Sequence, residues 1–197
     1  MSGRVRAAKK AETLRKPRAD SLRNRERVLE AATRIFSAGV AGASLEAVAR
    51  KAGVGIGTLY RHFPTREALF EAVYRHEVEL LVELAATLAR KGDPVDALRQ
   101  WLHANVRLAA TKKGMIEGLQ LAAHNPSELK AYSFRRLTDS VDLLLKRASA
   151  AGKIRADVSP ETLLRMLVGI FYSSGGGDWQ PEALRLVDVF VDGLRKR

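Results

Sequence analysis

The stretch SLEAVARKAGVGIGTLYRHF, residues 44–63, decides the fold of this chain. Its pattern indicates two short helices joined by a turn that contains glycine. Ser44 can cap the first helix, because its hydroxyl oxygen can accept a hydrogen bond from a free backbone N–H of the first turn. Gly53 can end that helix, because glycine adopts the left-handed conformation without a steric penalty. Leu59 and Phe63 then restart a helical apolar period. The spacing predicts a helix-turn-helix, a motif that places its second helix against DNA.

The rest of the chain also has a helical pattern. Glycine and proline separate long segments with a 3.6-residue apolar period, and no segment alternates cleanly as a strand would. We therefore expect an all-α fold of about nine helices, with a three-helix helix-turn-helix domain followed by a C-terminal helical domain for ligand binding and dimerisation. The helices expected outside the motif cover residues 20 or 23 to 37, 64–90, 94–111, 113–124, 127–150, 160–174 and 181–195. The expected domains are residues 20–66, completed by the next helix to about 82, and residues 67–197.

The positive charge is concentrated at the N-terminus. Residues 1–18 hold seven Lys and Arg residues against Glu12 alone, so they carry +6 of the net +12. We expect residues 1–19 to form a flexible basic tail, with Pro17 ending any helix there. Two interpretations stay open: an arm that grasps DNA phosphates, or a solvated tail.

Composition excludes several classes of protein. The chain has 197 residues and no Cys, which argues against disulfides and Cys-ligated zinc. It has no apolar run of about 18 residues, and its N-terminus lacks the apolar region of a signal peptide. We therefore expect a cytoplasmic protein that does not associate with membranes.

The region from residue 24 to residue 89 resembles the DNA-binding domain of TetR-family transcriptional regulators. The matching segments, in order, are residues 27–32, 36–39, 44–49, 52–54, 57–63 and 66–70. Residues 111–115 resemble the SbtR-like subfamily, whose C-terminal domain binds ligands. The resemblance implies DNA contacts, mostly with phosphate, from Ser44, Thr58, Tyr60 and His62. For the two aromatic residues, core packing against the first helix is the alternative.

The residues themselves add to this set of DNA contacts. Gly55 and Gly57 would leave the backbone open to close approach by phosphate. Arg61 could contact guanine or phosphate, and we favour phosphate. The family often has Lys after His-Phe, but here Thr65 or Arg66 must supply any such contact. The residues predicted to bind DNA are Ser44, Gly55, Ile56, Gly57, Thr58, Tyr60, Arg61, His62, Thr65 and Arg66.

The resemblance also implies a mechanism. A homodimer would place two recognition helices in successive major grooves of a pseudo-palindromic operator, and an unidentified small-molecule effector would release it from the DNA. Repression is what the family implies. The residues predicted to line an effector pocket are Trp101, His103, Arg107, Met115, Leu119, His124, Tyr132, Phe134, Met166, Phe171 and Tyr172. The residues predicted to form the dimer interface are Leu164, Leu167, Phe171, Leu184, Val187, Phe190, Val191 and Leu194. Ordinary core packing is the alternative for both sets.

Other classes of protein are less consistent with the pattern. The glycines at 53, 55 and 57 lack the preceding strand and the Lys-Ser/Thr pair of a phosphate-binding loop. The four histidines have no metal-ligand spacing, and no Ser lies in G-x-S-x-G. We therefore expect no catalytic residue, metal or cofactor. The alternative function is an all-helical small-molecule-binding protein whose helix-turn-helix no longer reads a specific site.

Overall fold

The computed structural model describes residues 2–38, 44–119, 127–173 and 179–196, with no side-chain detail for residues 2–19, 118, 172 and 173. The helices are α1 (Ser2–Ser37), α2 (Leu45–Ala52), α3 (Ile56–His62), α4 (Arg66–Leu88), α5 (Pro94–Gly118), α6 (Ser127–Ala150), α7 (Pro160–Ser173) and α8 (Gln180–Gly193). The described residues contain no strand, only an isolated antiparallel bridge between Ile154 and Arg195. The predicted all-α fold is confirmed.

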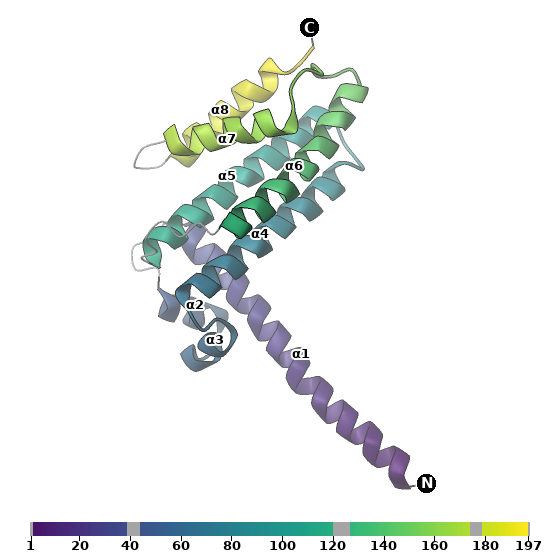
Figure 1. Cartoon of the computed structure of the whole chain (residues 1–197), viewed down its shortest axis with the longest axis vertical. Coiled ribbons are helices and arrows are strands. Elements are labelled where there is room, and N and C mark those ends of the chain that lie inside the picture. Colours follow the sequence, from purple (N-terminus) through teal and green to yellow (C-terminus); the bar gives the residue numbers. More distant parts are fainter. Residues whose placement is uncertain (1, 39–43, 120–126, 174–178, 197) are drawn as a thin grey trace.

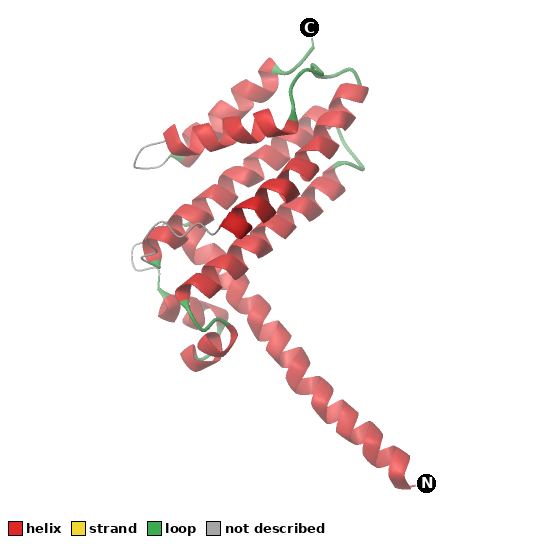
Figure 2. Cartoon of the chain, in the orientation of Figure 1, coloured by secondary structure: helices red, strands yellow, loops and turns green. Residues whose placement is uncertain are grey.

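The helices form two parts (Figure 1). The small reading domain consists of α1, α2, α3 and the first turns of α4, and the larger helical body consists of the rest of α4 with α5, α6, α7 and α8. The short helices α2 and α3 pack beside α1 at one end of the body. Helices α4, α5 and α6 run side by side through it, and α7 and α8 cover the far end. Within the described residues, short loops join α2 to α3, α3 to α4, α4 to α5 and α6 to α7 (Figure 2). In the part of the chain that is described, no helix is long and apolar enough to cross a membrane.

Each part has its own apolar core. In the reading domain, α1 contributes Val28 and Phe36, both fully buried, and α3 contributes Leu59. The end of α5 also reaches this core through Met115. In the body, Trp101 of α5 is fully buried among side chains of α4, α6, α7 and α8. Burying a large apolar side chain stabilises the fold by roughly 1.5–3 kcal/mol, so these residues fix the packing of the helices around them.

Helices α1 and α5 cross at Gly114 with very close backbone approach. A Cβ atom at this position would lie 1.8 Å from the carbonyl oxygen of Phe36. Glycine is therefore required by the packing, and it does not break the helix. The prediction of separate helices at 94–111 and 113–124 is wrong, because α5 continues to Gly118. This is one reason why the described residues hold eight helices and not about nine.

Helix α1 begins much earlier than the sequence predicted. It runs from Ser2, so the backbone of residues 2–19 is helical and Pro17 does not end the helix. Proline removes one backbone donor at a cost of about 3 kcal/mol, but the neighbouring Ala, Lys, Arg, Glu and Leu residues are strong helix formers. The helix projects away from the body toward its N-terminus (Figure 1).

Candidate functional site

The two caps predicted for the first helix of the motif are present. The Ser44 hydroxyl accepts a hydrogen bond from the backbone N–H of Ala47 at 3.2 Å. Gly53 has φ 65°, in the left-handed region, and its N–H donates to the Arg50 carbonyl oxygen at 3.2 Å. Arg27 of α1 packs against this turn, with Nη2 3.5 Å from the Gly53 carbonyl oxygen. The reversal between α2 and α3 is therefore fixed by capping and by a contact with α1.

One face of α3 is anchored in the reading domain. Leu59 is fully buried, and Phe63 at the end of the helix is buried beneath the Arg25 guanidinium, which lies 5.4 Å from the ring centroid. Because the helix has only seven residues, these two side chains decide which face turns outward.

The opposite face of α3 is open to solvent. Ile56 is 40% exposed and Tyr60 is 43% exposed, and Arg61 is also exposed. The Tyr60 side chain is therefore exposed and is not part of the buried core of the reading domain. A Cβ atom added at Gly55 or Gly57 would meet nothing within 4 Å, so another molecule can approach this backbone closely. Thr58 and His62 are half-buried beside these residues.

The two predicted contact residues at the start of α4 already have partners within the chain. The Thr65 hydroxyl caps α4 by accepting from the Ala68 N–H at 3.0 Å. The Arg66 guanidinium donates to the carbonyl oxygen of Leu119, just beyond α5, at 3.1 Å. Arg66 therefore connects the reading domain to the end of α5. This contact is not predicted by the sequence.

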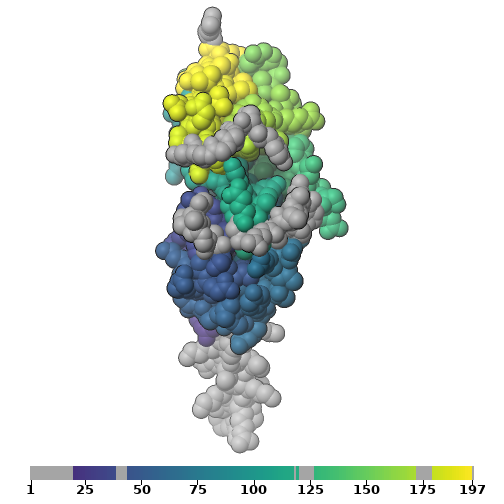
Figure 3. All heavy atoms as spheres, turned by 90° about the vertical axis from the view of Figure 1, so that its left-hand side faces the viewer, coloured from purple at the N-terminus to yellow at the C-terminus, as the bar shows by residue number. Residues whose placement is uncertain are grey.

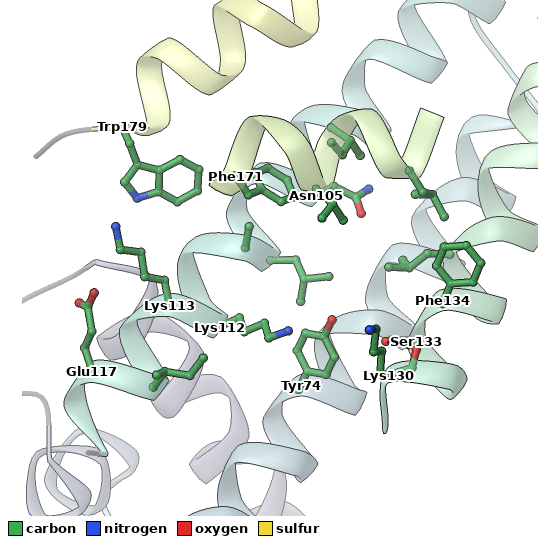
Figure 4. A pocket seen from close by; sticks show the side chains of 17 residues that line it. Tyr74, Asn105, Lys112, Lys113, Glu117, Lys130, Ser133, Phe134, Phe171 and Trp179 are labelled. Atoms are coloured by element: carbon green, nitrogen blue, oxygen red, sulfur yellow. Dashed lines mark hydrogen bonds between the residues drawn. The ribbon is translucent and has the colours of Figure 1, made fainter. Parts of the chain in front are cut away.

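The body contains a cavity of about 590 Å³. Figure 3 shows a recess in the surface of the body where α5 and α7 border one another, and Figure 4 shows the side chains that line the cavity. Tyr74 of α4 lines the cavity, and so does Trp179, which precedes α8. The remaining lining residues come from α5, α6 and α7: Asn105, Leu108, Ala109, Lys112, Lys113, Ile116, Glu117, Lys130, Ser133, Phe134, Leu137, Leu164, Leu167, Val168 and Phe171. This volume is typical of a small-molecule site.

Of the predicted effector residues whose side chains are described, Phe134 and Phe171 line this cavity. Trp101 is fully buried elsewhere, and its indole N–H donates to the Leu81 carbonyl oxygen at 2.9 Å. Met115 and Leu119 are buried in the core of the reading domain. For these three residues the prediction of a cavity role is wrong, because aromatic and sulfur-containing side chains also fill cores.

The other predicted effector residues fall into three groups. Two have polar partners on neighbouring helices: Tyr132 donates to Glu79, and the His103 ring lies 2.8 Å from an Asp188 carboxylate oxygen. Arg107 is exposed and Met166 packs against the body core, and neither lines the cavity. His124 and the side chain of Tyr172 lie outside the described residues.

Lysines are the cavity-lining residues that sequence reasoning missed. Lys112 is half-buried, with its ammonium nitrogen 5.3 Å from the centroid of the Tyr74 ring. Burial lowers the pKa of Lys112, and the nearby positive charge of Lys130 lowers it further. A signal existed in the sequence: Asn105, Leu108 and Lys112 follow one another at helical spacing, so they share one face of α5. Among the described residues, no group of three or more His, Cys, Asp or Glu side chains could hold a metal ion.

Comparison with known proteins identifies the family to which this arrangement of helices belongs. Residues 28–73 match the family model described as "Bacterial regulatory proteins, tetR family", and residues 93–196 match "Transcriptional regulator SbtR-like, C-terminal domain". The TetR transcriptional regulator SCO0520 from Streptomyces coelicolor is 40% identical and has a similar structure, with a TM-score of 0.74 over 87% of this chain and 98% of that chain. The chain belongs to the TetR family.

Other relatives agree with this assignment. A TetR regulatory protein from Mycobacterium vanbaalenii is 35% identical, with a TM-score of 0.69 over 91% of this chain and 99% of that chain. The transcriptional regulator UidR from Escherichia coli K12 is 27% identical over 181 residues, which are 87% of this chain and 89% of UidR. TetR-family proteins are DNA-binding transcriptional regulators and not enzymes, and they generally act as ligand-responsive dimers.

In this TetR-family chain, most predicted interface residues are already buried within one copy. Val187, Val191 and Leu194 belong to the body core, and Leu164 and Leu167 are buried beside the cavity, which Phe171 also lines. The interface prediction for the five buried residues is wrong, because they expose almost no surface to a partner. Leu184 and Phe190 are partly buried against the same core.

The exposed apolar residues on α7 and α8 lie on other positions of the same helices. Val168 of α7 is 49% exposed, and Leu186 and Val189 of α8 are 39% and 71% exposed. Figure 1 shows the two helices together at the end of the body opposite the reading domain. Each of these helices has apolar residues over a broad part of its surface, some of them buried in the core and some exposed. The sequence pattern does not distinguish the buried apolar residues from the exposed ones.

Proposed function

We propose that this TetR-family regulator is a ligand-responsive repressor that binds a pseudo-palindromic operator as a dimer and is released by a small-molecule effector. The observation that carries the proposal is the outward face of α3. Exposed Ile56, Tyr60 and Arg61 surround an open backbone on a helix that Leu59 holds in place. Since the proposed target is chromosomal DNA, we place the protein in the cytoplasm.

In the proposed complex, α3 lies in the major groove. Tyr60, His62 and Thr58 donate hydrogen bonds to phosphates beside the groove, and Ser44 contacts a phosphate from the start of α2. Arg61 extends from the exposed face and contacts phosphate in preference to guanine. Thr65 and Arg66 lie next to this surface at the start of α4 and complete the predicted set of contacts.

We propose that the dimer forms through α7 and α8. The support is the exposed apolar pair Leu186 and Val189, three residues apart on one face of α8, together with Val168 of α7, which is exposed and also borders the cavity; these residues replace the buried ones predicted from the sequence. Apolar groups exposed together on one face mark an interaction surface in many soluble proteins. Two copies related by a two-fold axis through this surface would each present one α3 to the same side of a duplex.

Helix α5 provides a physical route between the cavity and α3. Lys112 and Ile116 of α5 line the cavity, and Gly114 between them contacts the backbone of α1. Just beyond α5, the Leu119 carbonyl oxygen holds Arg66 at the start of α4. An effector that favours a different position of α5 would shift α1 and α4, and with them the separation of the two recognition helices. Binding of the effector would then weaken binding of the operator, and binding of the operator would weaken binding of the effector by the same coupling free energy.

Selection of duplexes from a random library by the purified full chain tests the proposal. We expect enrichment of a pseudo-palindrome, and the double variant Tyr60→Ala, His62→Ala should bind that duplex at least about tenfold more weakly, since two hydrogen bonds to charged groups are lost. Leu143→Ala is the control, because Leu143 is an exposed side chain of α6 with a similar exposed fraction, 45%. Salt-sensitive binding without any enriched sequence would favour the alternative, a helical binding protein whose motif no longer reads a site.

A further inference from the structure

The cavity has a positively charged subsite within otherwise apolar walls. Its charged lining residues in the described chain are Lys112, Lys113 and Lys130 against Glu117. Figure 4 shows the Lys112 and Lys130 side chains on either side of the Tyr74 phenol, while Lys113 and Glu117 lie toward Trp179. Two positive charges therefore share one part of the cavity, and the single carboxylate lies in another.

Lys112 lacks a compensating negative charge within the described residues. Its ammonium group faces the Tyr74 ring at 5.3 Å, and no carboxylate of the described chain forms an ion pair with it. Burial and the charge of Lys130 both lower the pKa of Lys112. This direction is expected where no nearby anion stabilises the charged ammonium group. Removing a cation from water is costly unless a counter-charge replaces its hydration, so this part of the cavity favours an anion.

The remaining walls favour an apolar body on that anion. Leu164, Leu167 and Phe171 of α7 face the cavity, and the Phe171 and Trp179 rings meet edge to face with their centroids 6.0 Å apart. Such surfaces gain from contact with aliphatic or aromatic groups, at roughly 25 cal/mol for each Å² removed from water. A small inorganic anion would leave most of a 590 Å³ cavity unfilled.

We infer that the effector is an amphipathic carboxylate, with its anionic group between Lys112 and Lys130 and its apolar body against α7. This inference rests on the proposed function, because it names the chemical class of the ligand that would occupy the regulatory cavity. Tyr74 and Ser133 line the same part of the cavity, but the Ser133 hydroxyl already donates to the Lys130 carbonyl oxygen at 3.0 Å, so the assignment of the anion depends on the two lysine charges.

Matched pairs of ligands test the charge requirement directly. Medium-chain fatty acids and aryl carboxylic acids are each compared with their own primary amide, which has nearly the same shape without the charge. Binding to the full chain is measured by isothermal titration calorimetry in the absence of DNA. We expect the acids to bind at least about tenfold more tightly than the amides, because charge-assisted hydrogen bonds are about twice as strong as neutral ones. Equal affinities, preference for the amides, or no binding by any acid at about 1 mM would overturn the inference.

Lysine variants then locate the preference within the cavity. Lys112→Gln and Lys130→Gln should each reduce the acid-to-amide ratio by about tenfold while leaving amide binding unchanged. Lys91→Gln removes the same charge from an exposed position outside the cavity and should leave the ratio intact. If Lys112→Gln destabilises the chain, unchanged amide binding still shows an intact cavity. Equal ratios in all variants would place the carboxylate elsewhere and overturn the assignment.

A separate readout distinguishes failure of this inference from failure of the proposed function. Operator affinity is measured with and without the tightest acid. An acid that binds through Lys112 but leaves operator affinity unchanged would support the ligand class and contradict release by an effector. A neutral ligand that binds in the cavity and weakens operator binding would support release by an effector and contradict the proposed ligand class.

Discussion

Replacing Gly114 with alanine should destabilise the protein, although alanine is the better helix former. The new Cβ atom would lie 1.8 Å from the Phe36 carbonyl oxygen, whereas ordinary contact begins at 3.4 Å. The backbones of α1 and α5 would have to separate by about 1.6 Å. Overpacking of this kind costs roughly 1–3 kcal/mol, and a clash with backbone belongs at the upper end of that range. Since alanine gains about 1 kcal/mol in helix propensity, we expect a net loss of about 2 kcal/mol.

Urea and thermal unfolding at one fixed protein concentration measure this loss. For a chain of this size, 2 kcal/mol lowers the Tm by roughly 4–8 °C. Gly193→Ala at the end of α8 is the control, because a Cβ atom there meets nothing within 4 Å, and its stability should stay unchanged or rise by up to about 1 kcal/mol. A Gly114→Ala protein as stable as the wild type would refute the close crossing of α1 and α5.

Three further predictions concern charge. Arg61→Ala should weaken binding of all duplexes about equally, because we expect a phosphate contact; relaxed preference at a single base pair in a repeated selection would instead show contact with guanine. Deleting residues 1–18, which carry +6, should flatten the plot of log affinity against log salt by up to about five units, and an unchanged slope would show that they do not touch DNA. Burial opposes ionisation of Asp188, but hydrogen bonds from Arg99 and His103 outweigh it and hold the pKa of Asp188 below its usual value. Stability from this carboxylate is therefore present above about pH 4 and lost as the pH falls through the lowered pKa, so the deficit of Asp188→Asn, below about 1 kcal/mol at this partly exposed site, should shrink in acid during pH-dependent urea unfolding.

The reading domain could be predicted from sequence because its signals are local. The Ser44 cap and the left-handed Gly53 depend on neighbouring residues in the chain, and both are present where expected. Gly114 shows the limit of such signals. Glycine in a helix pattern suggests a break, but here it allows the Phe36 backbone to approach, and that approach depends on residues far apart in the sequence.

The cavity was harder to predict because the sequence does not state which helical face turns inward. Aromatic residues in a helical pattern predict a pocket and a core equally well: Trp101 fills the core, whereas Phe171 lines the cavity. The set of residues predicted to line a pocket contains no lysine, although Lys112 of α5 lines the cavity. The same difficulty affects the proposed dimer surface, where Val187 is buried and Val189, two residues later, is 71% exposed.

The separation of the two recognition helices in a dimer is the central geometric claim, and the spacing of operator half-sites tests it most directly. The duplex recovered by selection is compared with one that has about five extra base pairs between its half-sites, which turns one half-site by about half a helical turn. Affinity is measured by fluorescence anisotropy, with the mass of each complex from light scattering. We expect one dimer on the selected duplex, and for the expanded duplex a loss of affinity toward the non-specific level, by about 10³-fold or more. Equal affinity for both duplexes, or a complex with a single chain per duplex, would contradict it.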